Sequence, residues 1–142
     1  MFSITKSFKF EAAHRLHNMP IGHQCRNIHG HSYVVKVTVS VEHLESDMVL
    51  DFGKLKAFQL YLDDQYDHAI ILNPNDVTII NFVQEMGFKN KIMNCEPTAE
   101  NMAYDFVQVV YNILKEFNIN SANIKVEVFE TVTSSATYES KF

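Results

Sequence analysis

The sequence predicts an α+β domain in which an antiparallel four-stranded sheet carries two helices on one face. Apolar and polar residues alternate through residues 2–14, 29–43 and 123–131, which is the period of a half-buried strand. Residues 53–66 and the segment after Pro97 instead space their apolar residues three and four apart, as a helix with one buried face does. The predicted order is therefore strand, strand, helix, helix, strand, strand.

The composition is that of an ordinary globular domain. The chain has 142 residues, of which 46% are hydrophobic and 20% are charged. Because Gly and Pro are scarce and no linker or repeat is visible, we expect one domain over residues 1–142. A net charge of −5 argues against a nucleic-acid or anionic-membrane surface. With neither a signal peptide nor a membrane span in the pattern, we expect a cytoplasmic protein with two reduced cysteines.

Each of the first two predicted strands has its apolar side chains on one side. In residues 2–14 these include Phe8 and Phe10, and in residues 29–43 they are four valines at alternate positions. We expect these two strands to pair as an antiparallel hairpin. A short fourth strand is expected near "SATYE", after the strand at residues 123–131.

Each expected helix begins at a residue that can accept a hydrogen bond from the first turn. Asp51 can cap the helix at residues 53–66, and Thr98 can cap the helix that follows Pro97. The first helix is expected to bury three side chains: Leu55, Phe58 and Leu62. Between the two helices, "NDVTIINFVQEMG" could form a short helix and "NKIMNC" a short strand.

Three histidines share the inward side of the predicted hairpin. Side chains two apart on a strand point the same way, so His29 and His31 project together on the side of the valines. His14 ends the first strand on its apolar side, and an antiparallel hairpin brings it opposite them. Three neutral imidazoles suit Zn²⁺ and leave the open fourth position of a catalytic site. The alternative is a set of hydrogen-bonded core histidines, but the third histidine in phase favours a metal.

Cys25 lies four residues before His29 and has three interpretations. As a fourth ligand it would close the site and make the zinc structural. As a thiolate near metal and imidazoles it could act as a base or nucleophile. It could also be a small buried apolar residue, which is the interpretation we favour for Cys95.

Three further residues, each with a carboxylate or an imidazole, are candidates for a functional role because of where they lie in the sequence. Glu130 falls on the apolar side of its strand, where it could accept hydrogen bonds from a guanidine-like edge of a ligand or pair with an internal Arg or Lys. Asp67 and His68 could form an acid–base pair, or His68 could simply stabilise a helix end. His23, two residues before Cys25, has no role that the pattern predicts.

These residues fall in short blocks that occur in a fixed order over nearly the whole chain. The blocks are "FEAAHRL", "GHQC-x3-HGHSY", "LDFGKLK", "YDHAIILN", "PTAEN" and "VFETVTSSATY". Together they resemble the 6-pyruvoyltetrahydropterin synthase / 6-carboxytetrahydropterin synthase family. The resemblance implies the tunnelling fold (T-fold), in which trimers close their sheets into a barrel. It also implies a homohexamer, a dimer of trimers, with sites between subunits.

The resemblance assigns a role to each candidate site residue. It implies that the imidazoles of the predicted hairpin bind Zn²⁺, and that the remaining residues bind or transform a pterin. The zinc ligands would be His14, His29 and His31; the catalytic residues Cys25, Asp67 and His68; and the pterin anchor Glu130. Candidates for binding the triphosphate, by their proximity to the motifs, are Arg15, Arg26 and Lys36.

The spacing C-x3-H-G-H resembles the bacterial 6-carboxytetrahydropterin branch, which serves queuosine and 7-deazapurine biosynthesis. The implied reaction is that of a lyase: it converts 7,8-dihydroneopterin triphosphate and water to 6-carboxy-5,6,7,8-tetrahydropterin, acetaldehyde and triphosphate. Two alternatives remain at this point. One is a 6-pyruvoyl-type synthase that only eliminates triphosphate, and the other is a zinc- and pterin-binding module without turnover.

Overall fold

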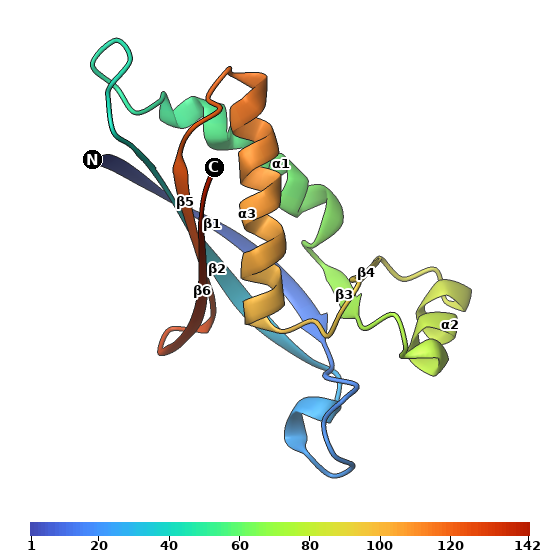
Figure 1. Cartoon of the computed structure of the whole chain (residues 1–142). Coiled ribbons are helices and arrows are strands. Elements are labelled where there is room, and N and C mark those ends of the chain that lie inside the picture. Colours follow the sequence, from blue (N-terminus) through green and yellow to red (C-terminus); the bar gives the residue numbers. More distant parts are fainter.

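The computed structural model of the chain describes residues 1–142 and has the predicted α+β architecture, built on one mixed sheet (Figure 1). The sheet has six strands in the spatial order β4-β3-β1-β2-β5-β6. The strands are β1 (Phe2–His14), β2 (His29–Val41), β3 (Ala69–Leu72), β4 (Asn90–Ile92), β5 (Asn123–Thr131) and β6 (Ser134–Lys141). The helices are α1 (Lys56–Gln65), α2 (Val77–Glu85) and α3 (Ala99–Glu116), with 3-10 turns at Gln24–Arg26 and Phe52–Leu55.

The prediction of four antiparallel strands with two helices is wrong in its count and in its topology. β3, α2 and β4 lie between α1 and α3 along the chain, and they add two strands and a helix. β3 pairs with β1 in parallel, and β4 pairs with β3 in parallel. β3 has four residues and β4 has three, so neither is long enough for alternation to identify it. The short helix and strand considered possible between the two predicted helices are α2 and β4.

The hairpin of β1 and β2 has the expected antiparallel pairing, and its register fixes the positions of the histidines. His14 lies directly opposite His29, and Ala12 lies opposite His31. Further from this end, Phe10 pairs with Tyr33 and their rings stack with centroids 4.6 Å apart. The side chains of these paired positions therefore share the face of the sheet that is covered by helices.

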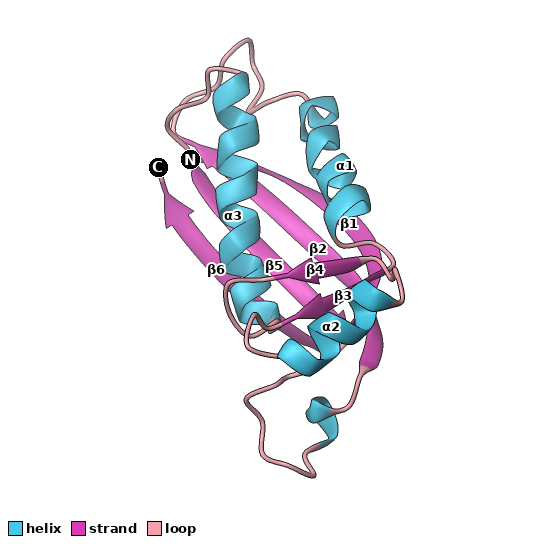
Figure 2. Ribbon diagram, turned by 90° about the vertical axis from the view of Figure 1, so that its right-hand side faces the viewer, coloured by secondary structure: helices cyan, strands magenta, loops and turns pink.

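Helices α1 and α3 cover one face of the sheet, with α3 extending along it (Figure 2). The three side chains predicted to be buried near α1 are all 0% exposed: Leu55, Phe58 and Leu62. Asp51 does act as a cap, but its Oδ1 accepts from Gly53 N in the 3-10 turn before α1. Thr98 caps α3 as predicted. None of the helices combines the length and the hydropathy that a bilayer crossing would need.

An alanine substitution on α1 tests this packing. Phe58 is fully buried between Phe8 and Phe106, with ring centroids 5.0 and 5.5 Å away. We expect Phe58→Ala to lower the free energy of unfolding by about 3–5 kcal/mol in urea denaturation, because it leaves a cavity. Leu60→Ala is the matched control on the same helix: its side chain is 58% exposed, and we expect a change within about 0.5 kcal/mol. Equal effects of the two substitutions would contradict this packing.

Candidate active site

Two histidine rings at the end of the hairpin are oriented by backbone carbonyls. His14 Nδ1 lies 2.7 Å from the carbonyl oxygen of Pro97, and His29 Nδ1 lies 2.7 Å from that of Asn27. A carbonyl oxygen can only accept, so in each neutral ring Nδ1 carries the proton and donates it. The two Nε2 atoms are therefore left with lone pairs, and they lie 3.0 Å apart.

The facing lone pairs fit a bound cation. Two unprotonated imidazole nitrogens at this distance repel each other unless a positive charge lies between them. The ligand nitrogen of His31 lies within 4.8 Å of both. Burial lowers the pKa of His14 to about 4, despite its hydrogen bond to Pro97, and burial also lowers the pKa of His31. Neutral imidazoles with Nδ1 bound to carbonyls form a donor set that could hold a metal ion.

The histidines open into a cavity of about 400 Å³. It is lined by His14, Leu16, Gln24, Cys25, His29, His31 and Glu130. Cys25 is a partly exposed free thiol on the 3-10 turn Gln24–Arg26. The group of ligand atoms within 4.8 Å of one another contains the three histidines and not Cys25. The thiol thus borders the candidate metal site without belonging to its donor set.

His23 has a structural role that the sequence does not reveal. Its Nδ1 accepts a hydrogen bond of 3.1 Å from the backbone N–H of Cys25 and so caps the turn that presents the thiol. Side-chain caps of this kind are usually Ser, Thr, Asp or Asn, so the sequence does not predict that a histidine in this position acts as a cap.

Glu130 lies on the same side of the sheet as the histidines, as its parity predicts. It is on β5, where the pairing with β6 shifts register between Phe129 and Thr131. Its carboxylate is 30% exposed, and Oε1 lies 3.9 Å from His14 Nε2. No Arg or Lys forms an ion pair with it, so the interpretation as half of an internal salt bridge is not supported. A carboxylate with free acceptor capacity faces the cavity instead.

Asp67 and His68 form a hydrogen-bonded pair at the start of β3. Asp67 Oδ2 lies 2.8 Å from His68 Nδ1, while its Oδ1 accepts a 2.8 Å hydrogen bond from Glu11 N. That bond from Glu11 lowers the pKa of Asp67 more than burial raises it, and the His68 ring lowers it further. The His68 side chain is 78% exposed, and its φ of 59° is in the left-handed region. The ionised carboxylate therefore orients an exposed imidazole in the turn between α1 and β3.

His68 lines a different hollow from the other candidate site residues. The second hollow, also of about 400 Å³, is lined by Glu11, Ala12, Ala13, Gly30, His31, Ser32, His68, Ala69 and Ile70. Only His31 borders both hollows. One chain therefore brings together the three histidines, Cys25 and Glu130, and it leaves Asp67 and His68 apart from them.

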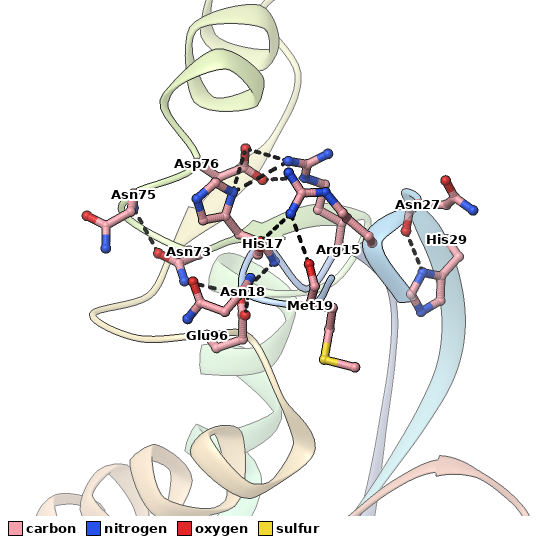
Figure 3. A network of polar contacts seen from close by, with 11 residues as sticks. Arg15, His17, Asn18, Met19, Asn27, His29, Asn73, Asn75, Asp76 and Glu96 are labelled. Atoms are coloured by element: carbon pink, nitrogen blue, oxygen red, sulfur yellow. Dashed lines mark hydrogen bonds and ion pairs between the residues drawn. The ribbon is translucent and has the colours of Figure 1, made fainter. Parts of the chain in front are cut away.

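Two of the three basic residues considered for phosphate binding are engaged elsewhere. Arg15 pairs with the buried carboxylate of Asp76, with Nε 2.6 Å from Oδ2 (Figure 3). Arg26 Nη1 donates to two backbone carbonyls of its own loop. Lys36 lies over the ring of Phe129, with Nζ 5.0 Å from its centroid. Arg15 and Arg26 thus stabilise the loop between β1 and β2.

Sequence reasoning missed the acidic partners of this loop. Glu96 accepts hydrogen bonds from the backbone of His17 and Asn18, at 2.8 and 2.7 Å, and from Asn73 Nδ2 at 3.1 Å (Figure 3). The only available signal was the position of Glu96 directly before the "PTAEN" block. Tyr33, 1% exposed with its hydroxyl 3.3 Å from His14 Nδ1, was also missed, although it shares parity with His31.

Removal of one imidazole tests whether the histidines bind a metal. We expect His29→Ala to weaken Zn²⁺ binding about 100-fold or more, because losing a whole ligand costs at least as much as losing an outer partner. Metal content after dialysis and Zn²⁺ titration measure the effect. His43→Ala is the control, since His43 is an exposed histidine outside the cavity. Equal Zn²⁺ affinity in the two variants would exclude the proposed donor set.

Comparisons with known proteins agree on one family. The family model described as 6-pyruvoyl tetrahydropterin synthase matches residues 3–141. A 6-carboxy-5,6,7,8-tetrahydropterin synthase of Aquifex aeolicus is 35% identical, covering 97% of this chain and 98% of the relative. A protein of that name from Rickettsia bellii is 33% identical, covering 92% and 95%.

A solved structure extends the likeness to the fold. The 6-pyruvoyltetrahydropterin synthase of Plasmodium vivax, solved as a catalytic residue mutant, superimposes with a TM-score of 0.75 at 17% identity. The match covers 99% of this chain and 98% of that one. With the family model spanning almost every residue and curated relatives aligned from end to end, the chain belongs to the 6-pyruvoyl tetrahydropterin synthase family.

Proposed function

We propose that this chain is a zinc-dependent lyase that converts 7,8-dihydroneopterin triphosphate and water to 6-carboxy-5,6,7,8-tetrahydropterin, acetaldehyde and triphosphate. The observation on which the proposal depends is the cavity where the three-histidine donor set, a free thiol and an unpaired carboxylate meet. Membership of the family makes the chain an enzyme of the lyase class, and the name shared by its curated relatives supports the 6-carboxy product.

Zn²⁺ would be held by His14, His29 and His31, which are neutral nitrogen donors of the kind that this ion prefers. When bound, it supplies a Lewis acid that polarises oxygen atoms of the substrate and acidifies the adjacent C–H bond. The carbonyls of Pro97 and Asn27 keep two of the rings in the tautomer that metal binding requires.

Glu130 would anchor the pterin. The amino-pyrimidinone edge of a pterin presents parallel N–H donors, and a carboxylate accepts two such donors side by side. Because Glu130 is half-buried and forms no ion pair with Arg or Lys, its oxygens are available for that edge. Its place on the cavity wall with the histidines would set the pterin's side chain toward them.

Cys25 and the pair of Asp67 and His68 would transfer protons on the substrate's side chain. Cys25 borders the metal donor set without belonging to it, which suits a proton acceptor or donor. Asp67 fixes the proton of His68 on Nδ1, so Nε2 is the basic nitrogen. Since His68 lines another hollow, we propose that the pair acts on substrate held by a neighbouring subunit, in a homohexamer with barrel-forming trimers.

We further propose that residues 1–142 form one domain, that the protein acts in the cytoplasm, and that its product serves queuosine or another 7-deazapurine. The composition and the family resemblance support these points. We propose no nucleic-acid or membrane partner, because the net charge of the chain is negative.

Product analysis tests the reaction directly. We expect zinc-loaded protein incubated with dihydroneopterin triphosphate to release acetaldehyde and triphosphate in equal amounts with 6-carboxytetrahydropterin, each identified by mass spectrometry. Triphosphate without acetaldehyde would instead support the 6-pyruvoyl alternative. Absence of any turnover by the zinc-loaded protein would reject both lyase reactions and leave a pterin-binding module. Chelator-treated protein, expected to be inactive, is the control.

Substitution of the thiol tests the role of Cys25. We expect Cys25→Ala to keep its zinc and to lower kcat by about 10²–10⁴-fold, the range for loss of a general acid or base. Cys95→Ala is the matched control, because Cys95 lies outside the cavity, and we expect its activity to stay near that of the unmodified protein. Loss of zinc from Cys25→Ala would show a ligand and refute the catalytic role.

A further inference from the structure

The segment that presents Cys25 is an irregular loop, residues 15–28, which we call the Cys25 loop. It leaves β1 directly after His14 and enters β2 at His29, so a candidate metal ligand flanks it on each side. Apart from one 3-10 turn it has no regular structure. The position of the thiol relative to the histidines therefore depends on individual backbone and side-chain contacts of the loop.

Contacts within the Cys25 loop join its two halves. The backbone N–H of Leu16 donates to the carbonyl of Cys25 at 2.8 Å. Arg26, the residue after Cys25, donates from Nη1 to the carbonyls of His17 and Met19, at 2.9 and 3.0 Å. The half of the loop that contains Cys25 is thus bound to the half that contains His17.

Two carboxylates from the chain between β3 and α3 bind the half that contains His17 in turn (Figure 3). Glu96 accepts from the backbone N–H of His17 with one oxygen and from that of Asn18 with the other. Asp76, 2% exposed, accepts from both Nε and Nη2 of Arg15, at 2.6 and 3.2 Å. Hydrogen bonds to an ionised acceptor are about twice as strong as neutral ones, so these contacts constrain the loop.

His17 connects the contact with Glu96 to the part of the loop that carries the thiol. The N–H of His17 donates to Glu96, and the C=O of the same residue accepts from Arg26, which adjoins Cys25. The residue after Glu96 is Pro97, whose carbonyl orients the His14 ring. Adjacent residues therefore hold both a candidate metal ligand and the loop that carries the candidate catalyst.

We propose that Glu96 and Asp76 are positioning residues, which fix the Cys25 loop so that the thiol lies at a set distance from the histidines. The proposal rests on the proposed function for its kinetic part only. A displacement of about 1 Å at a reacting group can lower a rate about 100-fold, so contacts remote from the substrate can control catalysis.

The test compares Glu96→Ala, Glu96→Gln and Asp76→Asn with Glu85→Gln, a control that removes an exposed carboxylate from the same part of the chain. Amide hydrogen exchange is measured for residues 15–28 and for α3, and the rate of Cys25 alkylation by iodoacetamide is followed by peptide mass. Kinetic constants and zinc content are measured on the same zinc-loaded samples.

We expect faster exchange in the Cys25 loop and unchanged exchange in α3 for Glu96→Ala and, to a smaller extent, for Asp76→Asn, which keeps one carbonyl acceptor. Cys25 alkylation should change at least about threefold, and kcat should fall about 10- to 100-fold with little change in KM or zinc content. Glu96→Gln, which keeps one carbonyl acceptor, should give a smaller effect in the same direction. Glu85→Gln should match the unmodified protein in every measurement.

Unchanged loop exchange and alkylation in both Glu96→Ala and Asp76→Asn would overturn the proposal. Equal acceleration of exchange in α3 and in the loop would also overturn it, because the carboxylates would then stabilise the fold in general. Should the unmodified protein fail to turn over dihydroneopterin triphosphate, the proposed function fails, while exchange and alkylation still decide the positioning role.

Discussion

The antiparallel register between β1 and β2 is the constraint on which the core and the candidate site both depend. In this register His14 faces His29, and two pairs along, Ala12 faces His31. The same register stacks Phe10 on Tyr33 in the core. Because side chains alternate along a strand, a shift of one residue would move the side chains of one strand to the other face and separate them from their partners on the second strand. Packing of the core therefore enforces the geometry of the imidazoles.

The segment before α3 sets the tautomer and the protonation state of His14. The segment leading into α3 covers His14 and supplies the carbonyl of Pro97, which fixes the ring's tautomer. Burial then keeps this imidazole neutral well into the acidic range, because its pKa falls to about 4. A neutral ring buried with its second nitrogen facing another lone pair is unfavourable by itself, and a bound cation relieves this conflict. The core thus prepares the donor set for a metal.

The sequence predicts those parts of the molecule that depend on local periodicity. The parity of His14, His29, His31 and Glu130 places them on one face, as the structure has them. β3 was missed, and β4 was expected only as a possible short strand, because strands of four and three residues leave no periodic pattern. Glu96 and Asp76 were missed for another reason. Their partners lie 79 and 61 residues away in sequence, and nothing local distinguishes them from solvated carboxylates.

The location of Asp67 and His68 bears on how a complete site would form. Both backbone groups of Glu11 hold the pair: its N–H donates to Asp67 Oδ1, and its carbonyl accepts from His68 N at 2.6 Å. The pair is thereby fixed to β1 and cannot swing across the sheet to the cavity of Cys25. Yet the His68 side chain is 78% exposed, which leaves it accessible to another chain. If Cys25 and His68 act on one substrate, that substrate must lie between subunits, and catalysis would require assembly.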